Sequence, residues 1–429
     1  MSSRQLDRRT FLQTAARHGL TLTGAGLLLS SGPETLVAWL AGGSGGDAGP
    51  GPGAALAAGD LESLVRQAPR ARYWTSTRSE GVRCTTCHLP DALQSLNAEL
   101  DFDHGQIVIK CLLCAQGCLI PEGERGRCRT RINVAGELRT LSYGRPVAVH
   151  IDPIEKKPFY HFLPGCQAFS LGTAGCPLHC KFCQNWEISQ ARPEDEEGEF
   201  VPPAQIVGAT ASRRVPVIAF TYNEPTVFTE YLTDIARQAR GRGLRSVMIS
   251  CGFMNEDPLT EMCECLDAIK IDLKGFSAEF YREVSSAELQ PVLRSIKQVA
   301  RSGRHLELVN LVVPTLNDSA VMLTELAKWV VGEVGPDVPV HFTRFHPDYQ
   351  LLNLPPTPVA TLERAWDIGR EQGLNFAYVG NVPGHPGNQT YCPGCGQVVI
   401  ERQGFFVSSV ALVDGQCASC GHAIAGVWQ

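Results

Sequence analysis

Between about residue 147 and residue 380, short apolar runs alternate with amphipathic helical patterns, and this alternation restricts the fold of the 429-residue chain most. Strands alternating with helices indicate βα units and a parallel sheet. The expected strands are 168–172, 216–221, 245–250, 267–273, 306–313, 339–345 and 375–379. The expected helices are 226–242, 258–266, 278–284, 289–303, 319–333 and 359–372. The predicted fold class is therefore α/β, a full or partial (β/α) barrel, with an open doubly wound sheet as the rival.

Polar residues follow several of the expected strands. Asn223 and Glu224 come directly after the second strand, and Asp272 and Lys274 close the fourth. Because the carboxyl ends of such strands face one mouth, we expect these side chains to line a common site. Structural alternatives exist: Glu224 with the following proline can open a helix, and charges that alternate on a strand can face solvent.

Three further features border the expected mouth. Asn317 and Asp318 follow the fifth strand, and we expect them to cap the next helix. His346 follows the sixth strand and is either a site residue or a satisfied core or loop histidine. The segment 150–165, HIDPIEKKPFYHFLPG, is expected to cross the mouth as a rigid wall or lid, with a solvated linker as the alternative.

Three cysteines follow the first strand at the spacing Cys-x3-Cys-x2-Cys. They are Cys176, Cys180 and Cys183, with Phe182 directly before the third. Three thiolates on one short loop can bind three irons of a cubane and leave the fourth iron without a protein ligand, which is a position for chemistry. The alternative is a structural zinc knuckle, in which His179 would complete a Cys3His site.

The remaining cysteines also fall in close sets, and the total of 17 is odd, which favours metal sites over a disulfide framework. One set is Cys111, Cys114, Cys118 and Cys128, whose spacing suits zinc or a second iron-sulfur cluster without choosing between them. Another set is Cys392, Cys395, Cys417 and Cys420, two knuckles around the β-like run 397–413. That arrangement predicts a zinc ribbon, with rubredoxin-like iron as the alternative. Cys84, Cys87 and His88 match the pattern of c-type haem attachment, but a metal half-site or plain loop thiols fit as well.

The first 60 residues read as a targeting segment and a linker. Arg8 and Arg9 precede Phe-Leu and a weakly apolar run, which resembles a twin-arginine export signal. The signal predicts export or membrane association, whereas the chemistry expected below favours the cytoplasm. The predicted divisions are 1–60 signal and linker, 61–146 cysteine-rich module, 147–380 barrel and 381–429 zinc-ribbon-like module. A net charge of -6 without a basic run excludes a nucleic-acid footprint.

With these residues in view, the chain resembles the AmmeMemoRadiSam system radical SAM (radical S-adenosylmethionine) enzymes, relatives of pyruvate formate-lyase activating enzyme. The resemblance covers roughly residues 105–428 and rests on specific motifs. They are EGERGRC (122–128), HIDPIEKKPFYHFLPG (150–165), SLGTAGC (170–176), CQNWEISQ (183–190), TYNEPT (221–226), IDLKGF (271–276), HFTRFHPDY (341–349), LPPTPV (354–359), YVGNVPGH (378–385) and the C-terminal ribbon.

The resemblance implies that the three cysteines of the first loop carry a [4Fe-4S] cluster, where an electron cleaves bound S-adenosylmethionine to a 5′-deoxyadenosyl radical. It implies that Asn223 and Glu224 face the methionyl amino group and that Asp272 and Lys274 are cofactor neighbours. It further implies a reductant such as flavodoxin or ferredoxin, and a protein of the same system as the substrate. The chain departs from the family at Cys251, where an asparagine is expected before Gly-Phe or Gly-Tyr.

Two other functions fit parts of the sequence. A glycyl-radical-enzyme activating enzyme is one, although the chain lacks the ferredoxin-like two-cluster cysteine insert found in many of them. The other is an exported, non-enzymatic iron-sulfur or zinc protein that carries electrons. It explains the signal but leaves the polar residues at the strand ends without a role.

Overall fold

An eight-stranded sheet forms the centre of the protein in the computed structural model, which describes residues 61–76, 107–196 and 199–429. The strand order is β13-β12-β11-β10-β9-β8-β7-β6, with β6 and β13 at the two open edges. Strands β7 to β13 run parallel, and β6 pairs antiparallel with β7. The α/β prediction of a partial barrel is therefore confirmed, and the barrel is not closed.

The seven strands expected from the apolar runs are all present. With the added antiparallel strand they are β6 (Ala148–Pro153), β7 (Gln167–Gly172), β8 (Val217–Phe220), β9 (Arg245–Ser250), β10 (Ala268–Asp272), β11 (His305–Val312), β12 (Val340–Arg344) and β13 (Ala377–Gly380). Strands such as β8 and β13 are buried at every residue. Strands covered on both faces carry continuous apolar runs, which is why these segments were recognisable in the sequence.

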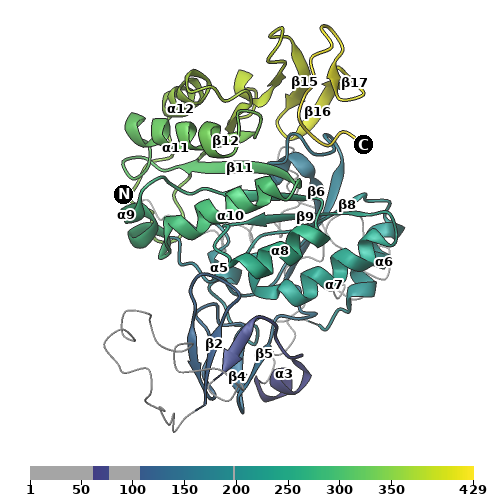
Figure 1. Cartoon of the computed structure of the whole chain (residues 1–429), viewed down its shortest axis with the longest axis vertical. Helices are drawn as coiled ribbons and strands as arrows, with labels where there is room; N and C mark the ends of the chain where they lie inside the picture. The colour runs from purple at the N-terminus through teal and green to yellow at the C-terminus, as the bar shows by residue number, and fades with distance from the viewer. Residues whose placement is uncertain (1–60, 77–106, 197–198) are drawn as a thin grey trace, which may run out of the picture.

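Helices connect the strands and cover the outer face of the sheet (Figure 1). They are α6 (Pro203–Ser212), α7 (Thr229–Arg240), α8 (Glu256–Cys265), α9 (Ala278–Phe280), α10 (Leu289–Arg301), α11 (Ala320–Glu333) and α12 (Val359–Glu371), with the short helices α5 (Trp186–Ser189), η2 (Ile154–Lys156), η3 (Pro225–Phe228) and η4 (Tyr281–Ser285). In α10 the buried Leu289, Val292, Leu293 and Ile296 recur at three- and four-residue spacing, the stripe of a helix packed on a core. Helix α6 was not predicted.

The inner face of the sheet is filled from its amino-terminal end by the segment after β6. Ile154, Phe159 and Phe162 are fully buried and pack on small inner residues of the first strands, such as Ala168 and Ala219. Strand β6 runs antiparallel to β7, so it delivers the chain to the end of the sheet opposite the mouth. The expectation that 150–165 crosses the mouth as a wall or lid is wrong in its position, because the apolar side chains of this segment plug the barrel from below. The segment still contributes to the cavity wall, through Lys156, Lys157 and Pro158.

A small module precedes the barrel. It contains α3 (Leu61–Gln67), a sheet of β1 (Trp74–Ser76), β2 (Val108–Cys111) and β3 (Leu119–Pro121), and the hairpin β4 (Arg131–Val134) with β5 (Glu137–Thr140). The module docks on the barrel through a buried ion pair, in which Arg131 Nη2 lies 2.7 Å from Glu230 Oε2 of α7.

A β-rich module follows the barrel and lies at the other end of the molecule's long axis (Figure 1). It contains η5 (Pro386–Asn388), β14 (Thr390–Tyr391), β15 (Val398–Gln403), β16 (Phe406–Val410), β17 (Leu412–Val413) and β18 (Gln416–Cys417). The fully buried Arg402 of β15 donates from Nη2 to the Tyr160 carbonyl (2.7 Å), which ties this module to the barrel plug.

Some sequence-based predictions fall outside the described residues: the twin-arginine-type segment, and the Cys84, Cys87 and His88 set. Within the described ranges, no helix has the length and apolarity needed to traverse a membrane.

Candidate active site

The loop after β7 carries the three cysteines of the Cys-x3-Cys-x2-Cys motif at the carboxyl end of the sheet. These cysteines are Cys176, Cys180 and Cys183. Neighbouring elements fix the loop backbone: Lys181 N donates to Val284 O of η4 (2.9 Å), and Gly175 N donates to Ile188 O of α5 (2.9 Å). The backbone hydrogen bonds of the loop to η4 and α5 therefore hold the three thiols in place.

Burial raises the pKa of each of these three thiols, and for Cys176 the pKa lies well above its ordinary value. The nearby Lys274 opposes this effect at Cys180. Buried thiols with raised pKa values become thiolates only beside a strong positive charge. Iron ions supply that charge, so the donor set fits an iron-sulfur cluster with one iron left open.

The loop borders a cavity of about 400 Å³ at the mouth of the barrel. All seven residues predicted for the cluster and the cofactor line this cavity: Cys176, Cys180, Cys183, Asn223, Glu224, Asp272 and Lys274. The thiol of the family departure, Cys251, lines it too. The structure therefore brings together at one mouth residues from four different strand ends.

Asn223 holds the cysteine loop in place. Its Oδ1 accepts a hydrogen bond from Thr173 N (3.1 Å), and its Nδ2 donates to Gly175 O (2.8 Å), directly before the first cluster cysteine. Asn223 is buried while it borders the cavity. Its side-chain amide is thus used to position the loop, a role that the sequence did not reveal.

Glu224 fixes the turn after β9. Its Oε2 accepts a hydrogen bond from Cys251 N (2.7 Å), and its Oε1 accepts one from the Ser250 hydroxyl (2.7 Å). Glu224 also caps η3 by accepting from Thr226 N (3.2 Å), so the simpler expectation that it opens a helix is confirmed. A buried carboxylate with this many donors is held rigidly at the cavity wall.

Asp272 lies between two lysines on the inner face of β10. Lys270 Nζ pairs with Asp272 Oδ1, and Lys274 Nζ lies 3.2 Å from Asp272 Oδ2. Burial alone would raise the pKa of Asp272, but the two lysines outweigh it and lower the pKa. Lys274 also lies 5.6 Å from the centre of the Phe182 ring, beside the cluster loop. The alternating charges therefore face the cavity and not the solvent.

A second group of this kind, centred on Asp152, reaches the floor of the cavity through Lys156, Lys157 and Tyr222, which line it. Lys156 Nζ and Lys157 Nζ each lie 2.7 Å from one oxygen of Asp152, and the Tyr222 hydroxyl donates to Asp152 (3.1 Å). Sequence reasoning missed this group because it placed 150–165 at the mouth. The signal that could have found it is the spacing Asp-x3-Lys-Lys at the end of a strand, which puts both ammonium groups within reach of one carboxylate.

Two other residues that follow strands, Asn317 and His346, do not line the cavity. Asn317 does not cap the following helix: Ser319 does, by accepting from Met322 N (3.2 Å). Asn317 Nδ2 instead donates to the Lys274 carbonyl (2.6 Å), which fixes the loop beneath that lysine. His346 is exposed and is not among the residues that line the cavity.

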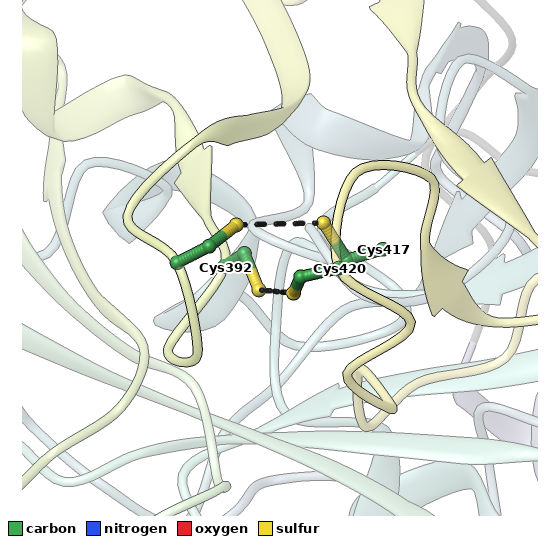
Figure 2. A group of neighbouring side chains, drawn as sticks. Cys392, Cys417 and Cys420 are labelled. Atoms are coloured by element: carbon green, nitrogen blue, oxygen red, sulfur yellow. Dashed lines mark hydrogen bonds between the residues drawn. The ribbon is translucent and has the colours of Figure 1, made fainter.

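The C-terminal module contains a four-cysteine centre, as the paired knuckles predicted. Cys392 Sγ lies 3.6 Å from Cys420 Sγ (Figure 2). Cys395 Sγ lies 3.8 Å from Cys417 Sγ. All four sulfurs lie within 4.8 Å of one another. Four such sulfurs can bind one metal ion tetrahedrally.

The other four-cysteine set lies where the first module meets the barrel. Cys111 N at the end of β2 donates to Cys118 O (2.9 Å), and Cys114 forms a β-bridge with Met254 beyond β9. Of the four, only Cys118 is partly exposed, and Cys128 lies next to the loop of the first cluster. The structure therefore gathers these thiols beside the active site.

A partial parallel barrel whose first strand leads into a three-cysteine loop over an inner cavity has the architecture of a radical SAM domain. The chain belongs to the radical SAM superfamily, whose family model matches residues 170–327. That range starts in β7 and includes the cysteine loop, Asn223, Glu224, Asp272 and Lys274. The protein is therefore an enzyme of this superfamily.

The similarity extends beyond the matched domain. The uncharacterized protein MJ0808 of Methanocaldococcus jannaschii is 42% identical over 318 residues, which cover 74% of this chain and 95% of that protein. The isethionate sulfite-lyase activating enzyme of Desulfovibrio desulfuricans is 22% identical over 109 residues, 25% of this chain and 35% of that enzyme. A domain of pyruvate-formate lyase-activating enzyme from Bacteroides vulgatus has a similar structure, with a TM-score of 0.35, 15% identity, and coverage of 38% of this chain and 98% of that domain.

Proposed function

We propose that this protein cleaves S-adenosylmethionine reductively and uses the resulting 5′-deoxyadenosyl radical to abstract hydrogen from a partner protein of the same system. The observation that carries the proposal is the single cavity lined by the three cluster cysteines, Asn223, Glu224, Asp272 and Lys274. A bound 4Fe-4S cluster with an open iron would supply the electron and the anchoring position for the cofactor.

The protein's own residues would bind and orient the cofactor. Two lysines pair with Asp152 and two with Asp272, so each group carries a net positive charge that favours anionic groups of a bound ligand. Lys274, beside the cluster loop, is placed to attract the carboxylate of the methionyl moiety, and the resemblance places Asn223 and Glu224 toward its amino group. Asn223 and Glu224 hold the loop and the turn that form the opposite walls.

The finer family assignment, to the AmmeMemoRadiSam system radical SAM enzymes, is supported by what its motifs do in this fold. The residues 150–165 supply both the apolar plug and the Asp152 group on the cavity floor. A motif that builds the floor of the cavity bears on substrate choice. We infer from the resemblance that the substrate is a protein.

Two alternatives make different predictions. A strict glycyl-radical-enzyme activating enzyme would act on a glycyl residue, and the local match to the isethionate sulfite-lyase activating enzyme favours this second candidate. An exported electron carrier needs neither the cavity nor its buried charges. We further propose zinc for the ribbon, since the sulfurs lie as close as four thiolates around one tetrahedral ion require and two Cys-x2-Cys knuckles are the usual zinc-ribbon pattern. Rubredoxin-like iron would give the same sulfur distances, and metal analysis distinguishes the two.

The test is anaerobic release of 5′-deoxyadenosine after reduction with titanium(III) citrate, measured for the native chain, Cys180→Ala and the control Cys166→Ser. Cys166 is a partly exposed thiol beyond the cavity lining. We expect release from the native chain and the control, and none from Cys180→Ala. Equal release from Cys180→Ala, or none from an iron-replete native chain, would refute the proposal.

A further inference from the structure

The thiols of Cys111, Cys114, Cys118 and Cys128 form a second site that the radical SAM chemistry leaves unexplained. Two observations bear on what it binds: the spacing of its sulfurs, and its contact with the cluster loop.

The sulfur spacing separates this site from the ribbon. In the described ranges, the ribbon is the one group of three or more Cys, His, Asp and Glu ligand atoms that all lie within 4.8 Å of one another. Neither Cys111 to Cys128 nor the cysteines of the first cluster are drawn together in this way. A single zinc ion requires that close approach, whereas an iron-sulfur cluster spreads its thiolates over separate irons.

The backbone around the sulfurs also fits a cluster. A Cβ placed on Gly126 would lie 3.8 Å from both Cys118 Sγ and Cys128 Sγ, so this glycine lies next to both sulfurs. Arg127 N donates to Cys118 Sγ (3.4 Å). Amide hydrogen bonds to sulfur stabilise cluster thiolates and tune the reduction potential.

The site is in direct contact with the active-site loops. A Cβ on Gly175, the residue before the first cluster cysteine, would overlap the carbonyl oxygen of Cys128. Gln116 Nε2 donates to the carbonyl of Pro177 (3.0 Å), and Ala115 N donates to the carbonyl of Phe253 (3.3 Å). A close backbone approach and a side-chain hydrogen bond therefore join the two cysteine-bearing segments.

We propose that Cys111, Cys114, Cys118 and Cys128 hold a second iron-sulfur cluster that passes electrons to the radical SAM site. Four protein thiolates occupy the iron positions that a substrate would need, so this cluster transfers electrons and does not bind substrate. A low-potential one-electron donor of the flavodoxin or ferredoxin class loses one electron. The second cluster gains that electron and passes it on to the first cluster, and no atom is transferred.

The test is metal analysis and low-temperature electron paramagnetic resonance of the full chain, purified anaerobically. The decisive variant replaces Cys176, Cys180 and Cys183 with alanine and leaves the second site intact. We expect it to keep about half of the native iron and acid-labile sulfide, and to give a cluster signal on reduction. We expect zinc to stay at the native ratio, because it belongs to the ribbon.

The reciprocal variant replaces the second set with serine, with Cys166→Ser as the matched control. We expect it to lose the other half of the iron and the corresponding signal, and the control to lose neither. If the alanine variant contains no iron, or if the serine variant loses zinc in place of iron, the proposal is wrong. The alanine variant keeps the test valid if the serine variant fails to fold.

Discussion

The ion pair between Arg131 and Glu230 provides the sharpest test of how the cysteine-rich module is attached to the barrel. Its side chains are 1% and 8% exposed, and Arg131 Nη2 lies 2.7 Å from both carboxylate oxygens. Burial opposes the charge of Arg131, but attraction by Glu230 outweighs it and raises the pKa of the guanidinium group. The guanidinium group is therefore charged inside the protein.

Removing one partner leaves the other as an uncompensated buried charge, which typically costs 3–5 kcal/mol. For Arg131→Met we expect a loss of about 3 kcal/mol, at the lower end of that range, because Glu230 keeps the hydrogen bond from Arg72 N (2.8 Å). The double variant Arg131→Met with Glu230→Gln removes both charges. We therefore expect its loss to fall short of the sum of the single losses by about 2 kcal/mol.

The assay is urea unfolding of the holoprotein followed by circular dichroism, with the two single variants and the double variant forming a mutant cycle. Arg245→Met is the matched control, since its pair with Asp267 (3.1 Å) is 47% exposed at the arginine. The control should lose less than about 1 kcal/mol. A loss of that small size for Arg131→Met, or additive losses in the double variant, would refute the argument that this pair anchors the module.

Two further predictions concern the floor of the cavity and the contact between the cysteine sets. Burial would raise the pKa of Asp152, but the positive charges of Lys157 and Lys156 outweigh burial and lower the pKa to about 2. The ionised Asp152 therefore stabilises the folded protein above about pH 4, and this stabilisation is lost as the pH falls through about 2. In acid unfolding, we expect the free energy of unfolding of the native chain to fall by about 2 kcal/mol between about pH 4 and about pH 2 on account of Asp152, and Asp152→Asn to lack this contribution. Equal acid sensitivity of the two proteins would contradict this prediction. Gly175→Ala should destabilise the protein and reduce its iron content, because the backbone φ is +91° and the added Cβ meets the Cys128 carbonyl. The control Gly208→Ala has open space around it inside α6, so it should keep the native iron content and unfold no more easily than the native chain, since alanine favours the helix more than glycine does.

The sequence alone determined the elements of the barrel and most of its site. The seven parallel strands carry continuous apolar runs because helices and plug cover both faces, and such runs are visible without a structure. The three cluster cysteines were evident because one short loop supplies them, so their proximity is local. Asp272 and Lys274 were evident because alternate residues of one strand share a face.

Only the tertiary structure showed the positions and contacts that depend on how distant segments of the chain pack together. Residues 150–165 were recognised as a rigid polar segment, but only the antiparallel pairing of β6 shows that they plug the barrel from below and bring Asp152 to the cavity floor. The helix-capping role expected for Asn317 belongs to Ser319, because Asn317 Nδ2 donates instead to the carbonyl of Lys274, just beyond the end of β10.

The same distinction holds for the metal sites. Spacing along the chain identified two four-cysteine sets but did not distinguish their metals. The folded structure distinguishes the two sets: it brings the ribbon sulfurs within 4.8 Å of one another, and it places Cys128 of the other set against the loop of the first cluster. The sequence shows which thiols are near one another along the chain, whereas the distances between their sulfurs depend on contacts between distant segments and bear on whether a single ion or a cluster fits the site.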